Sequence, residues 1–172
     1  MAKRVMGTAL IGYFALFVVL TLALGFRWNK QRKAPDQPIA FSHEIHAGKL
    51  NLDCLFCHEQ ADTSYFAGVP AVSKCMECHV AVKTDTEEVQ KLTEYWNNEE
   101  PIPWNRVHRI RIRKHVYFSH KRHVKKSVEC EECHGEVQAM TKVRAATSLK
   151  MGWCVACHQE KEAPTDCLIC HM

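Results

Sequence analysis

One short stretch of the sequence, FSHKRHVKKSVECEECH, brings together two cysteines and three histidines whose spacing suits a single cofactor. Cys130 and Cys133 can each form a thioether to a vinyl group of heme, and His134 then lies beside the macrocycle, where it can bind the iron axially. His120 and His123 can supply the opposite face of the same heme or of another one. The stretch therefore predicts a c-type heme attachment site with its own candidate axial ligands.

The Cys-x-x-Cys-His box occurs five times and uses all ten cysteines. In chain order, boxes one to five pair Cys54 and Cys57 with His58, Cys75 and Cys78 with His79, Cys130 and Cys133 with His134, Cys154 and Cys157 with His158, and Cys167 and Cys170 with His171. A zinc module and a disulfide framework are the competing interpretations. Neither explains why a histidine follows the second cysteine each time, so we predict five heme c groups.

The histidines outside the boxes are candidates for the second axial ligand of each iron. Six of the eleven histidines lie outside the boxes, and five irons would compete for them. A second F-S-H-x-x-H lead, with His43 and His46, precedes box one. Because these two are three residues apart, they can point from one helical turn toward two different irons. His108 and His115 are the spare ligands between the two leads.

The size and charge of the chain limit its fold and function. With five hemes in 172 residues, the macrocycles would make up much of the core, so we predict a mostly α and irregular fold with little regular secondary structure. The net charge of +4 omits the heme propionates and gives no case for nucleic-acid binding.

The N-terminal segment predicts a membrane anchor. Residues 5–26 form an apolar run without charge, long enough to cross a bilayer as a helix. A cleaved signal peptide is the alternative, but its apolar region is normally shorter. The basic residues after the run outnumber those before it, which by the positive-inside rule would keep the rest in the cytoplasm. Heme is attached to c-type cytochromes on the outer side of the cytoplasmic membrane. We therefore overrule the charge pattern and expect the heme domain on the periplasmic side of a bacterial cytoplasmic membrane.

We predict four parts: the anchor helix with its flanks (1–33), a diheme module (34–83), a linker helix with a basic segment (84–116) and a triheme module (117–172). The linker helix is expected over 84–97, beginning in a capping box at Thr84 and Glu87. Its predicted apolar face comprises Val89, Leu92, Tyr95 and Trp96, and a second short helix is expected to present Val137, Met140, Val143 and Ala146.

The basic segment, WNRVHRIRIRKHV, alternates basic and β-branched residues, as an extended strand does. Arg109, Arg111 and Arg113 then form either a solvated face or a positive surface that neutralises heme propionates or an acidic partner.

The two leads, the later three boxes and the close final pair resemble class III multiheme cytochromes c. The resemblance implies a multiheme domain of that type and four distal ligands: His43 for box one, His46 for box two, His120 for box three and His123 for box four. That family has a further histidine before the penultimate box, for the last heme. This chain has Leu149-Lys-Met-Gly-Trp there, so Met151 is the nearest candidate and His108 the alternative.

Further motifs resemble the pentaheme cytochrome c component of alternative complex III, a quinol:electron acceptor oxidoreductase. They are Ala67-Gly-Val-Pro70, Pro101-Ile-Pro-Trp104, Val107-His108, Val116-Tyr-Phe-Ser-His120 and Met151-Gly-Trp-Cys154. The resemblance implies an iron–sulfur/molybdopterin-like subunit, polytopic quinol-binding membrane subunits, a monoheme cytochrome c and a terminal oxidase as partners.

The expected function is electron transfer within such a complex, from quinol oxidation to a periplasmic acceptor or oxidase, and not catalysis by this chain alone. A methionine ligand raises the reduction potential of a heme, so electrons would be expected to leave the protein from a heme that Met151 ligates. The alternatives are a stand-alone membrane-anchored quinol dehydrogenase and a multiheme reductase with one open iron. The sequence leaves the direction of electron flow open.

Overall fold

The computed structural model describes residues 2–31, 34–108 and 115–171, and in the first of these stretches it describes the side chains of residues 10–25. The chain divides into two compact units, Met1–Lys33 and Ala34–Met172. The face predicted for Arg109, Arg111 and Arg113 falls on residues outside those described.

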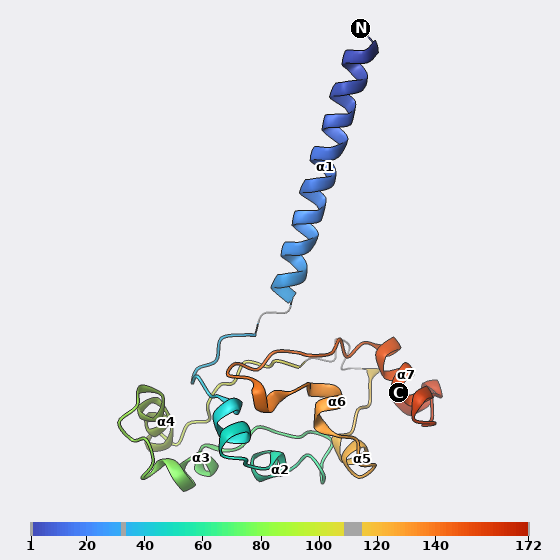
Figure 1. Ribbon diagram of the computed structural model, residues 1–172. Helices are drawn as coiled ribbons and strands as arrows, with labels where there is room; N and C mark the ends of the chain where they lie inside the picture. Colours follow the sequence, from blue (N-terminus) through green and yellow to red (C-terminus); the bar gives the residue numbers. More distant parts are fainter. Residues whose placement is uncertain (1, 32–33, 109–114, 172) are drawn as a thin grey trace. The chain divides into compact units, whose positions relative to one another are not determined.

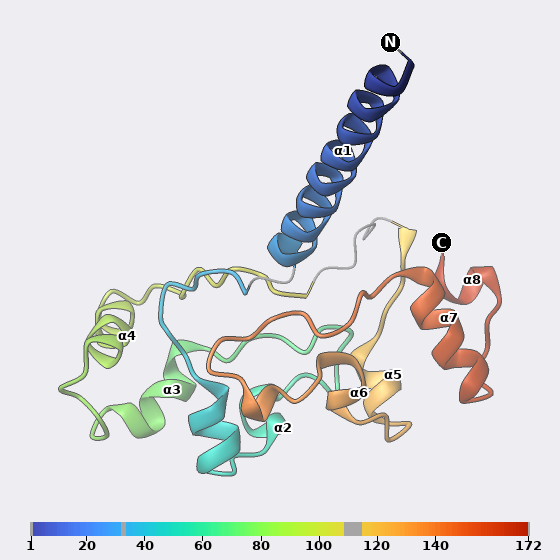
Figure 2. The same cartoon turned by 45° about the horizontal axis from the view of Figure 1, so that its top comes forward.

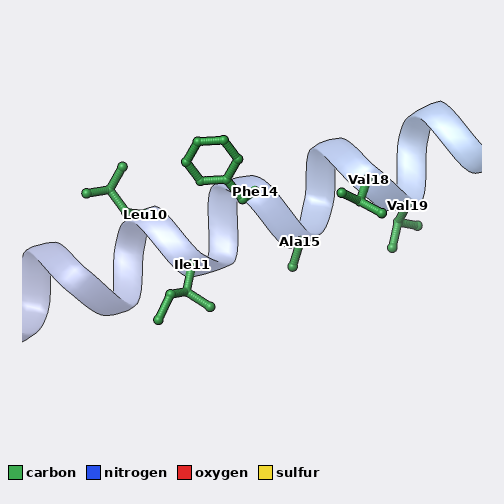
Figure 3. Close-up of a pocket in the computed structure, with 6 residues that line it drawn as sticks. All are labelled: Leu10, Ile11, Phe14, Ala15, Val18 and Val19. Carbon is green, nitrogen blue, oxygen red and sulfur yellow. The ribbon is translucent and has the colours of Figure 1, made fainter.

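The first unit is one helix, α1 (Ala2–Gln31), drawn in blue in Figure 1. Three adjacent pairs of apolar side chains, which repeat every four residues, line a shallow hollow on it (Figure 3): Leu10 and Ile11, Phe14 and Ala15, and Val18 and Val19. Across the residues that the structure describes, no helix combines the length and apolar character needed to cross a membrane. The transmembrane helix predicted within residues 1–33 is therefore not supported.

The second unit consists of short helices joined by long irregular segments, and no strand occurs among its described residues (Figure 2). The predicted mostly α and irregular fold is confirmed. Its helices are η1 (Glu44–Lys49), α2 (Cys54–Cys57), α3 (Val72–His79), α4 (Glu87–Asn97), α5 (His120–Val124), α6 (Cys130–His134), η3 (Val137–Ala139), α7 (Met151–Glu160) and α8 (Cys167–Cys170).

Each box lies on a helical turn. Helices α2, α6 and α8 begin at the first cysteine of boxes one, three and five. Box two forms the last part of α3, and box four lies inside α7. At box one, the Asp53 carboxylate accepts the Leu55 N–H at 2.7 Å and so caps the turn. Because residues three apart share a helix face, the two cysteines of a box point the same way. One helical turn therefore presents both sulfurs to a single macrocycle.

The apolar core of the second unit is small. Ile39, Met76, Leu92 and Ile102 form one buried cluster, which joins α3 and α4 to the two flanking segments. The Gln37 side chain donates to the Asn105 carbonyl and accepts the Asn105 N–H, both at 2.8 Å, which ties those segments together. No described side chain has less than 2% of its surface exposed. The polypeptide alone does not enclose a core of ordinary size.

Helix α4 confirms the predicted linker helix but not its start or its whole apolar face. The helix begins at Glu87, and Thr86 rather than Thr84 precedes its first turn, without a side-chain capping bond. The Thr86 hydroxyl donates to the Lys83 carbonyl at 2.9 Å, so the preceding turn uses it instead. Trp96 is 46% exposed, because the cluster beside the helix is too small to cover it.

The second predicted amphipathic helix is wrong. Only the 3-10 turn η3 forms, and Met140, which follows it, has extended backbone. The Met140 carbonyl accepts the Glu44 N–H at 3.1 Å. Pairing with the segment at η1 therefore replaces the hydrogen bonds that would have continued a helix.

The close approach of η1 to η3 requires glycine at position 48. A Cβ atom there would lie 2.5 Å from the Gln138 carbonyl oxygen. We expect Gly48→Ala to lower the free energy of unfolding of the heme-loaded protein by about 1–3 kcal/mol, because one backbone must move. Chemical denaturation measures this change.

Gly152, in α7, is the matched control, because a Cβ atom there meets nothing within 4 Å. Gly152→Ala should leave stability unchanged or raise it by about 0.5–1 kcal/mol, the usual gain from alanine in a helix. Equal losses in the two variants would contradict the close packing of η1 on η3.

Candidate heme centres

No disulfide joins any of the ten cysteines, so each sulfur is available for a thioether. Burial raises the pKa of Cys75 and Cys133, and burial followed by the nearby Cys54 raises the pKa of Cys130 to about 11. Within the described part of the chain, no group of three or more His, Cys, Asp or Glu side chains is placed to hold a metal ion. The described residues thus contain neither a disulfide nor a ligand group of the kind that zinc requires.

The box histidines share one hydrogen-bonding pattern. In four boxes the ring Nδ1 lies 2.7–3.0 Å from a backbone carbonyl oxygen: His58 with Gly68, His79 with Val82, His158 with Pro164 and His171 with His115. A carbonyl oxygen can only accept, so Nδ1 carries a proton, and in the neutral ring Nε2 then has the free lone pair. Iron-binding histidines commonly have this arrangement, because the second bond orients the ring and raises its basicity.

Three of the upstream histidines follow the same pattern. His46, His120 and His123 have Nδ1 at 2.9, 3.0 and 2.8 Å from the carbonyl oxygens of Ser42, Tyr65 and Ser119. Their Nε2 atoms are therefore also available as ligands. Neither the sequence spacing nor the box motif indicated which carbonyls would orient them.

Three upstream histidines lie opposite three box histidines. The ring centroids are 6.0 Å apart for His46 and His79, 6.4 Å for His120 and His134, and 6.1 Å for His123 and His158. Two imidazoles on opposite sides of one metal, each with a metal–nitrogen bond of about 2 Å, have centroids roughly 6 Å apart. At each of boxes two, three and four, the box histidine and its upstream partner therefore fit the two sides of one heme iron.

His43 is placed near box one. Its Nδ1 is buried and has no hydrogen-bond partner. Burial, then the neighbouring His58 and His46, lowers the pKa of His43 to about 4. The ring is thus kept neutral beside the proximal histidine of box one, as a ligand requires.

The phenylalanine of each lead positions both of its histidines, a role that sequence reasoning missed. Phe41 stacks on His46 with centroids 4.4 Å apart and meets His43 edge-on at 4.8 Å. Phe118 stacks on His123 at 4.6 Å and meets His120 edge-on at 4.9 Å. The phenylalanine repeated at the start of both leads was the available signal. It holds two rings in different orientations, so they can serve two different irons.

Neither candidate for the second ligand of the box five heme, Met151 or His108, has a described contact with box five. Met151 is 66% exposed in the first turn of α7. His108 instead lies against His134, with ring centroids 4.3 Å apart and His134 Nδ1 3.3 Å from His108 Nε2. Burial and the nearby His120 lower the pKa of His108 and so favour its neutral ring. If His134 binds iron through Nε2, its Nδ1 carries the proton and donates to His108 Nε2.

His134 thus differs from the other four box histidines, because its described Nδ1 partner is a side chain. Replacing His108 with leucine removes the acceptor and weakens the basicity of His134. We expect the midpoint potential of the box three heme to rise by about 20–65 mV, equivalent to one hydrogen bond of about 0.5–1.5 kcal/mol. Spectroelectrochemical titration measures the change.

His108→Gln, which keeps an acceptor oxygen, should recover much of the wild-type potential. His115→Leu is the matched control, because His115 is exposed and the contact it makes with His171 uses its backbone carbonyl. If His108→Leu and His115→Leu titrate alike, the bond from His134 to His108 has no effect on the heme.

Comparison with known protein families agrees with this geometry. Residues 26–103 match the class III cytochrome c family, and residues 116–172 match the family of cytochrome c7 and related cytochrome c. Both matched segments are of multiheme cytochrome c type, and each contains one F-S-H-x-x-H lead.

Two relatives are subunits of reductases. The chain is 33% identical over 129 residues to the multiheme cytochrome c subunit of menaquinone reductase from Nitratidesulfovibrio vulgaris, which covers 72% of this chain and 59% of the relative. It is 27% identical over 96 residues to the acrylate reductase cytochrome subunit from Shewanella woodyi, covering 56% of this chain and 62% of the relative. The chain is therefore related to multiheme cytochrome c subunits but spans less than two thirds of either relative.

Proposed function

We propose that this protein is an electron-transfer subunit that carries five covalently attached heme c groups. The observation that carries the proposal is the placement of three upstream histidines 6.0–6.4 Å, ring to ring, from three box histidines. The four segments 1–33, 34–83, 84–116 and 117–172 would then be the anchor region, a diheme module, a linker and a triheme module.

The residues of the chain hold and tune the cofactors. Each bound heme supplies a one-electron couple between ferrous and ferric iron. The cysteines of each box would attach the macrocycle, the box histidine would supply one ligand to its iron, and His43, His46, His120 and His123 would supply the second ligands of boxes one to four. Backbone carbonyls hold the rings in the iron-binding tautomer. At boxes one to four, two protein ligands on each iron would exclude substrate, which favours electron transfer over catalysis at those hemes.

The proposed setting is a quinone-linked respiratory complex. Both relatives are cytochrome subunits of reductases, one of them a menaquinone reductase. We propose a place like that of the pentaheme component of alternative complex III, with the heme domain on the periplasmic side. An iron–sulfur/molybdopterin-like subunit, polytopic quinol-binding subunits and a monoheme cytochrome c would be its partners. Quinol oxidation would supply the electrons, and a periplasmic acceptor or a terminal oxidase would receive them.

The test is native purification in mild detergent, with mass spectrometry of this chain and assays of quinol oxidation. We expect a mass increase equal to five hemes, low-spin ferric spectra, and copurification with iron–sulfur and polytopic subunits in an assembly that oxidises quinol. Fewer attached hemes would refute the cofactor count. Quinol oxidation by the isolated chain would instead support the stand-alone dehydrogenase, and a high-spin heme that binds small molecules would support the multiheme reductase.

A further inference from the structure

The five boxes do not follow one another in space as they do in the sequence. In Figures 1 and 2, the helix α3 of box two lies at one end of the second unit, beside α4, and α2 of box one lies farther in. Helix α6 of box three follows, then α7 of box four, and α8 of box five lies beyond α7 in Figure 2. Contacts between the boxes support the same order.

Boxes two and one are direct neighbours. Lys74, just before box two, pairs with Glu59, just after box one, at 2.8 Å. The same ammonium group lies 4.4 Å from the ring centre of Phe56, inside box one.

Box one is also a neighbour of box three. The segment after box one binds α5, because the Tyr65 carbonyl accepts the His120 N–H at 3.2 Å and the Ser64 carbonyl accepts the Lys121 N–H at 3.0 Å. Tyr65 further accepts from the His120 ring at 3.0 Å and so orients the distal ligand of box three. Box one therefore lies between boxes two and three.

Box three leads on to box four, and box four to box five. Glu132, inside box three, pairs with Lys161, shortly after box four, at 2.9 Å. His123 from the lead of box three faces His158 of box four. Only eight residues separate His158 of box four from Cys167, the first residue of box five. Box four is therefore in contact with box three and joined to box five by this short segment.

We propose that the heme centres form a linear series in the order two, one, three, four, five, with boxes two and five as its ends. The proposal rests on the proposed function and adds an order to it. Box one, first in the sequence, becomes the link between the diheme and triheme modules. Electrons that enter at box two and leave at box five, or the reverse, must then pass box one. A series that followed the sequence would make box one an end and box two an inner member.

The discriminating experiment compares two heme-deletion variants, Cys54→Ala/Cys57→Ala and Cys75→Ala/Cys78→Ala, by spectroelectrochemical titration of the heme-loaded protein. Neighbouring irons shift each other's potentials, because the charge of one acts on the next and the effect falls with distance. Loss of box one should shift two of the four remaining potentials, whereas loss of box two should shift one. The opposite result, one shift for box one and two for box two, would overturn the proposed order.

A second measurement covers the case in which a deletion variant does not fold. Diffraction from crystals of the intact heme-loaded protein, collected at the iron absorption edge, locates each iron beside its attached cysteines. Iron positions in the order two, one, three, four, five would support the proposal, and any other order would refute it. A wild-type protein with five hemes but another order would leave the proposed function intact. One with fewer than five would refute the proposed function separately.

Discussion

Replacing His120 with methionine should raise the midpoint potential of one heme by on the order of 0.1 V, a part of the roughly 0.8 V range that axial ligands cover. The ring of His120 is nearly parallel to that of His134, with an interplanar angle of 12° and centroids 6.4 Å apart. A thioether in its place stabilises ferrous iron relative to ferric iron. Spectroelectrochemical titration of the variant should show one transition displaced upward, with smaller changes in its neighbours.

Lys121→Met is the matched control, because it introduces the same side chain at the next residue of α5, on an exposed position. Its potentials should match those of the wild-type protein. If His120→Met also titrates like the wild type while keeping its hemes, His120 is not an iron ligand and the pairing with His134 is wrong. A simultaneous shift in the near-infrared charge-transfer band would identify methionine as the new ligand.

Replacing Leu92 with alanine should lower the free energy of unfolding of the heme-loaded protein by about 2–5 kcal/mol. Leu92 is 5% exposed and lies in the cluster with Ile39, Met76 and Ile102. The deletion leaves a cavity in a small core, so few neighbouring side chains can move in to fill it. Because Met76 lies inside box two, the box two heme should also titrate less uniformly. Chemical denaturation followed at the heme absorption band measures the loss of stability, and spectroelectrochemical titration measures the change at the heme.

Leu50→Ala makes the same chemical change at a side chain that is 62% exposed. It should alter the free energy of unfolding by no more than about 0.5 kcal/mol. Equal and small losses in the two variants would show that the packing of α3 on α4 adds little. The hemes alone would then account for the stability of this end of the protein.

The features that could be predicted from the sequence are those decided within a few residues. The Cys-x-x-Cys-His spacing predicts a helical turn that presents two sulfurs on one face, and each box lies on such a turn. The apolar periodicity around Val89 and Leu92 predicts α4, because burying one face of a helix favours that periodicity. The helix predicted from Val137 onward does not form, because the Met140 carbonyl accepts the N–H of Glu44, a residue far away in the sequence. Local propensities are too small to resist such a contact.

The sequence by itself therefore determined the five Cys-x-x-Cys-His boxes, the histidines outside them and the duplicated lead. The tertiary structure alone decided which groups meet across the chain. It placed His108 against His134, positioned the histidines of each lead through Phe41 or Phe118, and set box one between boxes two and three. The physical reason is that attachment depends on covalent spacing within five residues. The choice of neighbours depends on ion pairs, hydrogen bonds and packing between residues tens of positions apart, which no local pattern encodes.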